Sequence, residues 1–155
     1  MEKNHRYFTQ MEWKGNLGTG TSEYKAYSRN FEICADQKPV LLGSSDPAFR
    51  GDASRYNPEE MLVGAVSSCH MLWYLHLCAV NHVVVLEYLD NAAGTMTENA
   101  GGSGEFTEVT LKPSIRVRES SMREKALQLH EEAHKMCFIA RSINFPVHIQ
   151  PTITS

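Results

Sequence analysis

The stretch NPEEMLVGAVSSCHMLWYLHLCAV, residues 57–80, decides how the whole chain is interpreted, because it predicts a long central helix. Asn57 is a preferred N-cap residue, and Pro58 suits the first helical position. Two glutamates follow in the first turn, where carboxylates complement the helix dipole. From Met61 to Val80 the sequence is apolar on almost every side, which is typical of a helix that runs through a core. We therefore expect the other elements to pack around this helix.

The segment before the helix predicts short strands joined by turns. Residues that favour strands occupy positions 6–14, and a glycine-rich break follows at 15–21, which indicates a hairpin. Residues 24–35 alternate apolar and polar side chains, and residues 39–42 form another short apolar run. Residues 44–56 are rich in turn formers, so we expect a loop that leads into the helix.

The segment after the helix predicts further strands and a second helix. Residues 83–96 and 106–118 read as two strands joined by a loop rich in Gly and Asn. A second helix runs from a serine cap at residues 120–121 to Met136, with apolar side chains at three- and four-residue spacing. Residues 146–154 close the chain as a strand. This mixture of strands and helices predicts an α+β fold.

Length, charge and hydropathy limit the class of protein. A chain of 155 residues is the size of one domain, so we expect residues 1–155 to form a single domain. The chain has 15 Lys and Arg against 18 Asp and Glu, which gives no field that would attract nucleic acid or an anionic membrane. The first ten residues lack the apolar core of a signal peptide, and no run reaches the roughly 18 apolar residues of a membrane span. We expect a soluble cytoplasmic protein.

Four cysteines are too few for a disulfide framework in a chain of this size. Cys34 and Cys78 carry no local signature, so we expect both to be buried packing residues. Cys69 and Cys137 each lie in a segment that reads as a buried helix. If the two helices pack together, these two thiols can meet, although buried packing alone would also explain each of them.

The segment from Asn57 to Cys69 resembles the signature of the OsmC/Ohr family of thiol-dependent hydroperoxide reductases, in which an Asn-Pro-Glu helix start precedes the reactive cysteine. Cys137 ends the second helix, precedes Phe-Ile-Ala-Arg-Ser, and is similar to the family's second cysteine. The resemblance covers most of the chain, which looks like a divergent member. It implies an OsmC-like fold, with antiparallel sheets around two central helices in an intertwined homodimer.

The resemblance also implies a reaction. Cys69 would attack the O–O bond of a peroxide and become a sulfenic acid, and Cys137 would condense with it to a disulfide. An external dithiol would then reduce the pair, and no bound cofactor is implied. The neighbours of Cys69 are rich in Leu, Met, Trp and Tyr, and an apolar pocket favours organic hydroperoxides over hydrogen peroxide.

A thiolate near neutral pH needs a nearby cation, because burial alone raises a thiol pKa. Glu59 is similar to the family carboxylate that orients an arginine over the thiol. It precedes Cys69 by ten residues of one helix, or about 15 Å along the axis, so we expect it to serve the thiol of a partner subunit. First-turn dipole complementation would also explain this glutamate.

The activating arginine departs from the family pattern. The family arginine usually lies in the glycine-rich turn near the N-terminus, and residues 16–20 contain none. Arg50 and Arg55, in the loop before the helix, are the expected substitutes, with Arg29 as a third candidate. Without an arginine near the thiol, a non-catalytic, small-ligand-binding protein with the same fold is the alternative.

A second alternative is a zinc-dependent hydrolase. His130, Glu131 and His134 form a His-Glu-x-x-His motif on a predicted helix, in which two imidazoles bind zinc and the glutamate serves as base. The motif needs a third ligand, and the buried stripe of this helix leaves Glu131 toward solvent. A metal cluster of the Cys and His residues at positions 69, 70, 76 and 78 is disfavoured, because they radiate around one helix axis. We expect His70 to fill a dimer interface.

Overall fold

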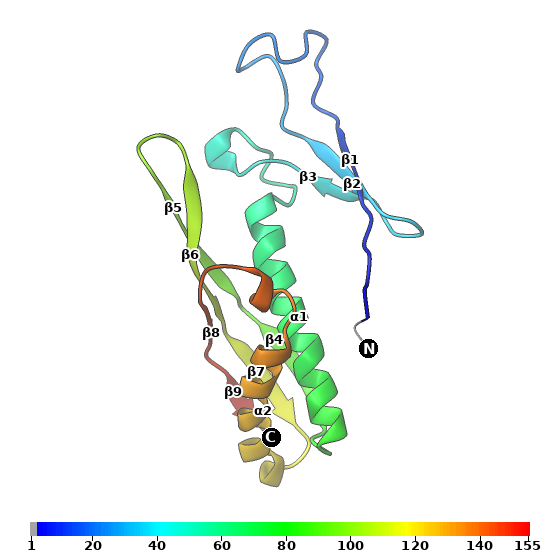
Figure 1. Ribbon diagram of the computed structural model, residues 1–155, viewed down its shortest axis with the longest axis vertical. Coiled ribbons are helices and arrows are strands. Elements are labelled where there is room, and N and C mark those ends of the chain that lie inside the picture. The colour runs from blue at the N-terminus through cyan, green and yellow to red at the C-terminus, as the bar shows by residue number, and fades with distance from the viewer. Residues whose placement is uncertain (1–2) are drawn as a thin grey trace. The chain divides into compact units, whose positions relative to one another are not determined.

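The computed structural model describes residues 3–155. The chain forms two compact units, of which the first ends at Met61 and the second covers Leu62–Ser155. Figure 1 labels the elements of both units in chain order. That the two units fold together as a single domain stays a prediction.

The first unit contains a three-stranded antiparallel sheet. Its strands are β1 (Gln10–Trp13), β2 (Phe31–Cys34) and β3 (Leu41–Gly43), in the spatial order β1-β2-β3. The 3₁₀ helix η1 (Pro47–Phe49) lies in the loop that leads to the first long helix. The predicted hairpin and the short third strand are therefore confirmed.

The strand predicted over residues 24–35 is only partly formed. Its regular part is β2, and the residues before it bend. The Arg29 guanidinium donates to the carbonyl oxygens of Tyr24 and Tyr27, both at 2.8 Å. Backbone hydrogen bonds from Lys14 to Asn30 and from Ser28 to Gly15, with the isolated bridge of Asn16 to Tyr27, continue the pairing without forming a regular strand.

The long helix α1 (Pro58–Val80) begins as the sequence predicts. The Asn57 Oδ1 accepts a hydrogen bond from the Glu60 N–H at 2.7 Å, and the Glu60 carboxylate accepts the Asn57 N–H at 3.2 Å. This reciprocal pair is a capping box, which satisfies two N–H groups that the first turn leaves free. The chemistry that starts α1 is therefore entirely local.

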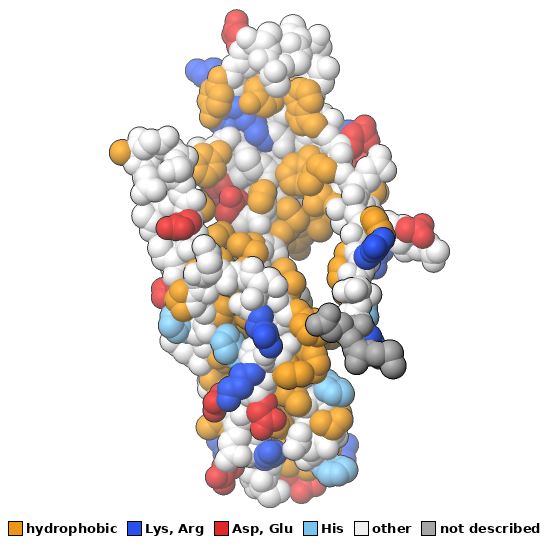
Figure 2. Space-filling model, viewed as in Figure 1, with side chains coloured by type: hydrophobic (Ala, Val, Ile, Leu, Met, Phe, Trp, Pro, Cys, Tyr) orange, Lys and Arg blue, Asp and Glu red, His pale blue; other side chains and the backbone are white. Residues whose placement is uncertain are grey.

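The prediction that α1 is buried all round is wrong for the single chain. Its fully buried side chains form one stripe at four-residue spacing: Val66, His70, Tyr74 and Cys78. Leu72 and Val80 stay 63% and 57% exposed, and apolar side chains reach the surface in many places (Figure 2). By length and composition α1 could also cross a membrane, a property that core helices share. One chain covers only one face of α1.

The second unit contains two three-stranded sheets of mixed direction. One has the order β4 (Val85–Asp90), β7 (Pro113–Val117) and β9 (Thr152–Thr154). The other has the order β5 (Ala93–Glu98), β6 (Gly104–Leu111) and β8 (Val147–Ile149). The β4–β7 and β5–β6 pairs are antiparallel, whereas β7–β9 and β6–β8 are parallel. The α+β fold is confirmed; these two sheets are mixed, whereas the β1-β2-β3 sheet is purely antiparallel as predicted.

Each of the three strands predicted after α1 is split in two, with one half in each sheet. The corner between β4 and β5 is held by Asp90, whose carboxylate accepts the Lys112 N–H at 2.7 Å and the Ser67 hydroxyl. Pro113 begins β7 and Pro151 precedes β9, positions where the missing N–H costs no ladder bond. The chain therefore changes sheet at each of these points.

The second helix, α2 (Arg123–Met136), is confirmed, but its serine cap is not. The 3₁₀ helix η2 (Ser120–Met122) precedes it, and neither helix start has a side-chain cap bond. A third 3₁₀ helix, η3 (Ala140–Ser142), follows α2. The main core lies between α1, α2 and the β4-β7-β9 sheet; its fully buried members include Tyr74, Ile115, Val117, Ala126, Leu129 and Ala133. Figure 1 shows α2 alongside the C-terminal half of α1.

Candidate functional site

The structure brings the thiols of Cys69 and Cys137 together. Cys69 lies half-buried on α1, and Cys137 is fully buried where α2 ends and the backbone becomes extended. The two side chains are neighbours, close enough that Cys69 raises the pKa of Cys137, and both cysteines are free thiols. The second unit thus holds an adjacent dithiol with one member open to solvent and the other closed off.

The two thiols have different electrostatic surroundings. Burial, as the largest cause, and the neighbouring Cys69 thiol together raise the pKa of Cys137 to about 11. Hydrogen bonds from the backbone N–H groups of Ala140 and Ile139 lower the pKa of Cys137 and so partly offset this rise. The Ala140 nitrogen lies 3.4 Å from the Cys137 Sγ. Cys137 is therefore a protonated thiol at neutral pH, suited to attack only after its partner has reacted.

An apolar surface adjoins the dithiol. Leu72, Trp73 and His76 follow Cys69 by three, four and seven residues, so they share its face of α1, and they line a pocket of about 260 Å³. Trp73 packs edge-on against Phe138, with ring centroids 5.6 Å apart. Since Phe138 directly follows Cys137, aromatic side chains flank both thiols.

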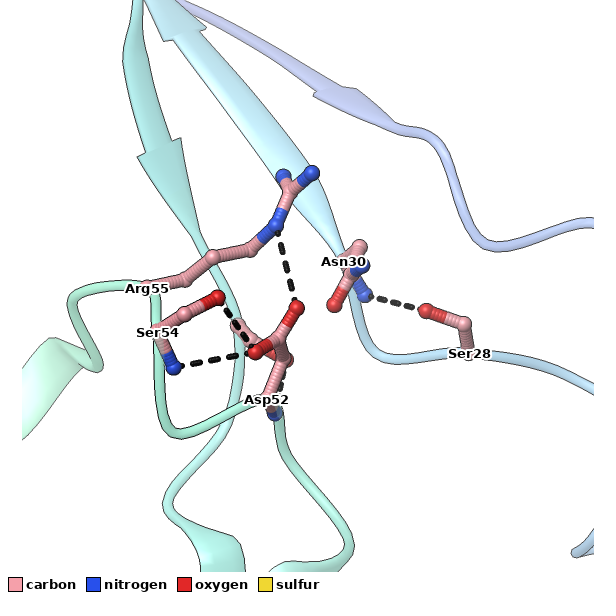
Figure 3. A network of polar contacts seen from close by, with 6 residues as sticks. Ser28, Asn30, Asp52, Ser54 and Arg55 are labelled. Carbon is pink, nitrogen blue, oxygen red and sulfur yellow. Dashed lines mark hydrogen bonds and ion pairs between the residues drawn. The ribbon is translucent and has the colours of Figure 1, made fainter.

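Arg55 is held by a carboxylate in the first unit. Its Nε lies 3.5 Å from the Asp52 Oδ2, and Asp52 also accepts hydrogen bonds from the N–H and hydroxyl of Ser54. These bonds lower the pKa of Asp52, with the Ser54 hydroxyl as the largest cause. Figure 3 shows that the terminal nitrogens of Arg55 point away from Asp52. The Nη1 is buried and has no hydrogen-bond partner within residues 3–155.

The other two arginines have different surroundings. Arg29 lies over the rings of Tyr24 and Tyr27, at 4.6 and 4.1 Å, and its guanidinium bonds two carbonyls. Arg50 has a left-handed backbone, with φ of 66°, and its exposed guanidinium lies 5.7 Å from the Tyr24 ring. Of the three, Arg55 best combines a fixed position with unused donors.

Glu59 lies in the first turn of α1, as the sequence predicts. Its Oε2 is buried and lacks a hydrogen-bond partner in the described part of the chain. Glu59, Arg50 and Arg55 belong to the first unit, and both thiols belong to the second. An arginine beside Cys69 therefore stays a prediction.

The prediction that His70 fills a dimer interface is wrong, because its side chain lies in the core of its own chain. It is 1% exposed, and its Nε2 lies 3.0 Å from the Nδ1 of His130, which is 4% exposed. Tyr74 stacks on His130 with ring centroids 3.9 Å apart. No sequence signal singles out His70, because the other faces of α1 are nearly as apolar as the stripe of Val66, His70 and Tyr74.

The zinc motif is not assembled. Within residues 3–155 no group of three or more His, Cys, Asp or Glu side chains is placed to hold a metal ion. His130 faces His70, and Glu131 is exposed and binds the Lys135 Nζ at 2.7 Å. His76 is exposed, whereas Cys78 is buried in the core as expected, so no cluster forms along α1 either. Cys34, which the sequence predicts to be buried, is only half-buried on β2.

Comparison with known proteins agrees with this fold. The sequence model of the family described as OsmC-like protein matches residues 51–152. An OsmC-like protein of unknown function from Vibrio cholerae is 28% identical, with a TM-score of 0.87, over 96% of this chain and 100% of that one. An organic hydroperoxide resistance protein from Elizabethkingia anophelis is 16% identical, with a TM-score of 0.71, over 100% and 99%.

A third structure is an organic hydroperoxide resistance protein from Legionella pneumophila, 14% identical with a TM-score of 0.64, over 98% of this chain and 100% of that one. No curated protein sequence matches the chain. The two hydroperoxide resistance proteins share the fold, and the family model covers both thiol positions. The resemblance seen in the sequence is therefore confirmed: this chain belongs to the OsmC-like protein family.

Proposed function

We propose that the protein reduces organic hydroperoxides, with Cys69 as the attacking thiol and Cys137 as the resolving thiol. The observation that carries this proposal is the proximity of a half-buried and a fully buried free thiol, close enough that Cys69 raises the pKa of Cys137. Two proteins with the same fold are named organic hydroperoxide resistance proteins, which supports the substrate class.

The reaction balances with these two thiols and an external dithiol. The Cys69 thiolate attacks the terminal oxygen of R–O–O–H, the O–O bond breaks, and the alkoxide leaves as an alcohol after it takes up a proton. Cys69 becomes a sulfenic acid. The Cys137 thiol then attacks the Cys69 sulfur, a disulfide forms and water leaves. The dithiol reductant restores both thiols by two exchange steps and is itself oxidised to a disulfide.

The assignment of roles follows from burial and pKa. Cys137 is fully buried, and burial raises its pKa to about 11, so it is neither accessible to peroxide nor ionised at neutral pH. Cys69 is half-buried and shares its helix face with the apolar pocket at Leu72, Trp73 and His76. That pocket would take the hydrocarbon part of the substrate, which hydrogen peroxide lacks.

The cation that activates Cys69 is proposed to be Arg55, held by Asp52 and accompanied by Glu59 from a second copy of the chain. The Arg55 Nη1 and the Glu59 Oε2 are both buried without partners within residues 3–155. The exposed apolar side chains of α1, Leu72 and Val80 among them, would be covered in a homodimer. Arg50 stays the second candidate. We propose a cytoplasmic protein without nucleic-acid or membrane partners.

The test is a thiol count and intact mass before and after one equivalent of cumene hydroperoxide. Wild type should lose two thiols to a Cys69–Cys137 disulfide, and Cys137→Ser should accumulate oxidised Cys69. Cys69→Ser should not react, whereas Cys78→Ser, a matched control in the core, should behave as wild type. Four unchanged thiols in wild type would contradict the proposal and support the small-ligand-binding alternative.

A kinetic comparison tests the substrate class. If the apolar pocket binds the substrate, kcat/KM for cumene hydroperoxide should exceed that for hydrogen peroxide by at least roughly tenfold, since burying a few methylene groups contributes about 1.4 kcal/mol or more. Trp73→Ala should reduce this preference while leaving the hydrogen peroxide rate near the wild-type value. Equal efficiencies for both peroxides in wild type would refute the role of the pocket.

A further inference from the structure

A hydrogen bond between two buried histidines links α1 to α2 beside the dithiol. His70 directly follows Cys69 on α1, and His130 lies two helical turns before Cys137 on α2. The His70 Nε2 and the His130 Nδ1 are 3.0 Å apart. In the described residues this is the one hydrogen bond between a side chain of α1 and a side chain of α2.

Each imidazole depends on the other for its polar contact. The remaining ring nitrogens, His70 Nδ1 and His130 Nε2, are buried and have no partner within residues 3–155. If the helices moved apart, both rings would lose their one hydrogen bond in surroundings that water does not reach. The hydrogen bond between His70 and His130 therefore opposes separation of α1 from α2 at these two residues.

Tyr74 restricts the same two rings. Its ring is nearly parallel to both imidazoles, with interplanar angles of 13° to His130 and 17° to His70. The two imidazole planes differ by 10°. The three rings are thus nearly parallel, and the hydrogen bond joins α1 to α2 one residue from Cys69 and two turns from Cys137.

We propose that His70 and His130 are positioning residues that hold the Cys69 and Cys137 thiols in contact. The proposal rests on the thiol pair of the proposed function, but not on its peroxide substrate. A dithiol held in contact has a high effective concentration, which favours its disulfide over mixed or separate thiols. Loss of the hydrogen bond between His70 and His130 should therefore make the Cys69–Cys137 disulfide easier to reduce.

The experiment measures the equilibrium of the reduced protein with glutathione disulfide, in which the two protein thiols are oxidised to a disulfide and two glutathione molecules are released. The Cys69–Cys137 disulfide is quantified by peptide mass at several ratios of glutathione to its disulfide. No hydroperoxide is present, so the result is independent of peroxidase activity.

Two variants separate the hydrogen bond from the ring. His130→Phe keeps a ring on Tyr74 but removes the hydrogen bond, whereas His130→Asn places an amide atom near the Nδ1 position and removes the ring. Val117→Ala is the control, since it removes buried volume from the same core on β7 and touches neither histidine bond. If His130→Phe does not fold, His130→Gln replaces it. The glutamine amide lies one methylene farther from the backbone than the Nδ1 position, so it does not restore the hydrogen bond to His70.

We expect His130→Phe to lower the equilibrium constant at least tenfold, which corresponds to about 30 mV. His130→Asn and Val117→Ala should stay within about twofold of wild type. An unchanged constant in His130→Phe, an equal fall in His130→Asn, or no disulfide in wild type would overturn the proposal. If glutathione disulfide oxidises the wild-type thiols to the Cys69–Cys137 disulfide but cumene hydroperoxide does not react, the proposed function is contradicted. The positioning role of the two histidines would then still stand.

Discussion

Acid should unfold this protein through His70 and His130. Burial, as the largest cause, and the nearby His134 lower the pKa of His70 from its ordinary 6.5 to about 4, and Asp90 opposes the shift. Burial and the neighbouring His70 lower the pKa of His130 to about 3. Both rings are therefore neutral in the folded chain at any pH above about 4.

The direction of the effect follows from proton binding. Below about pH 6.5 the unfolded chain protonates both histidines and the folded chain does not, so folding stability is complete above pH 6.5 and is lost as the pH falls toward 4. Each pH unit in this window costs about 1.4 kcal/mol per histidine. Acidification from pH 7 to pH 4.5 should cost about 2–3 kcal/mol for each ring, a large part of a typical stability of about 5–15 kcal/mol.

Urea unfolding at pH 7, 6, 5 and 4.5 measures this loss. His130→Asn removes one of the two titrating groups and should lose about 2–3 kcal/mol less than wild type over the same interval. His148→Gln is the control, because it replaces an exposed histidine that lies outside the buried pair. The same pH dependence in wild type and His130→Asn would refute the reasoning.

Three further substitutions test the fold by urea unfolding. Asn57→Ala removes the capping box with Glu60 and should cost about 0.5–2 kcal/mol, whereas Asn57→Asp should keep most of it. Ile115→Ala creates a cavity in a fully buried site and should cost about 2–5 kcal/mol. Asp90→Ala removes the acceptor of the Lys112 N–H and should cost about 1–3 kcal/mol of folding free energy. Hydrogen exchange at the Lys112 amide should become faster. An exchange rate equal to that of wild type would contradict the role of Asp90 at the corner between β4 and β5.

The start of α1 could be predicted because everything that specifies it lies within four residues. Asn57 and Glu60 exchange hydrogen bonds at a separation of three residues, so the sequence contains both partners side by side. The split of each later strand could not be predicted in this way. The corner after β4 depends on Asp90 accepting a hydrogen bond from Lys112, 22 residues away, and no local pattern marks that contact.

The same distinction between local and long-range contacts explains which parts of the candidate site could be predicted. Two local signatures predict Cys69 and Cys137 as a pair, and the structure makes the two thiols neighbours. The histidine pair was missed because its members are 60 residues apart and because α1 is apolar on nearly every face. On such a helix the four-residue stripe that contains His70 is hidden among equally apolar neighbours, and only the packed structure distinguishes it.

Two incomplete features of the single chain have one common explanation. The apolar surface of α1 at Leu72 and Val80 is largely exposed, and burying one such side chain contributes about 1.5–3 kcal/mol. The Arg55 Nη1 and Glu59 Oε2 are buried without partners inside the described chain, a costly state for a charged group. The proposed second copy of the chain would cover the exposed apolar surface of α1. It would also supply partners to the Arg55 and Glu59 side chains. The same assembly would bring Glu59 to a thiol that its own helix keeps about 15 Å away.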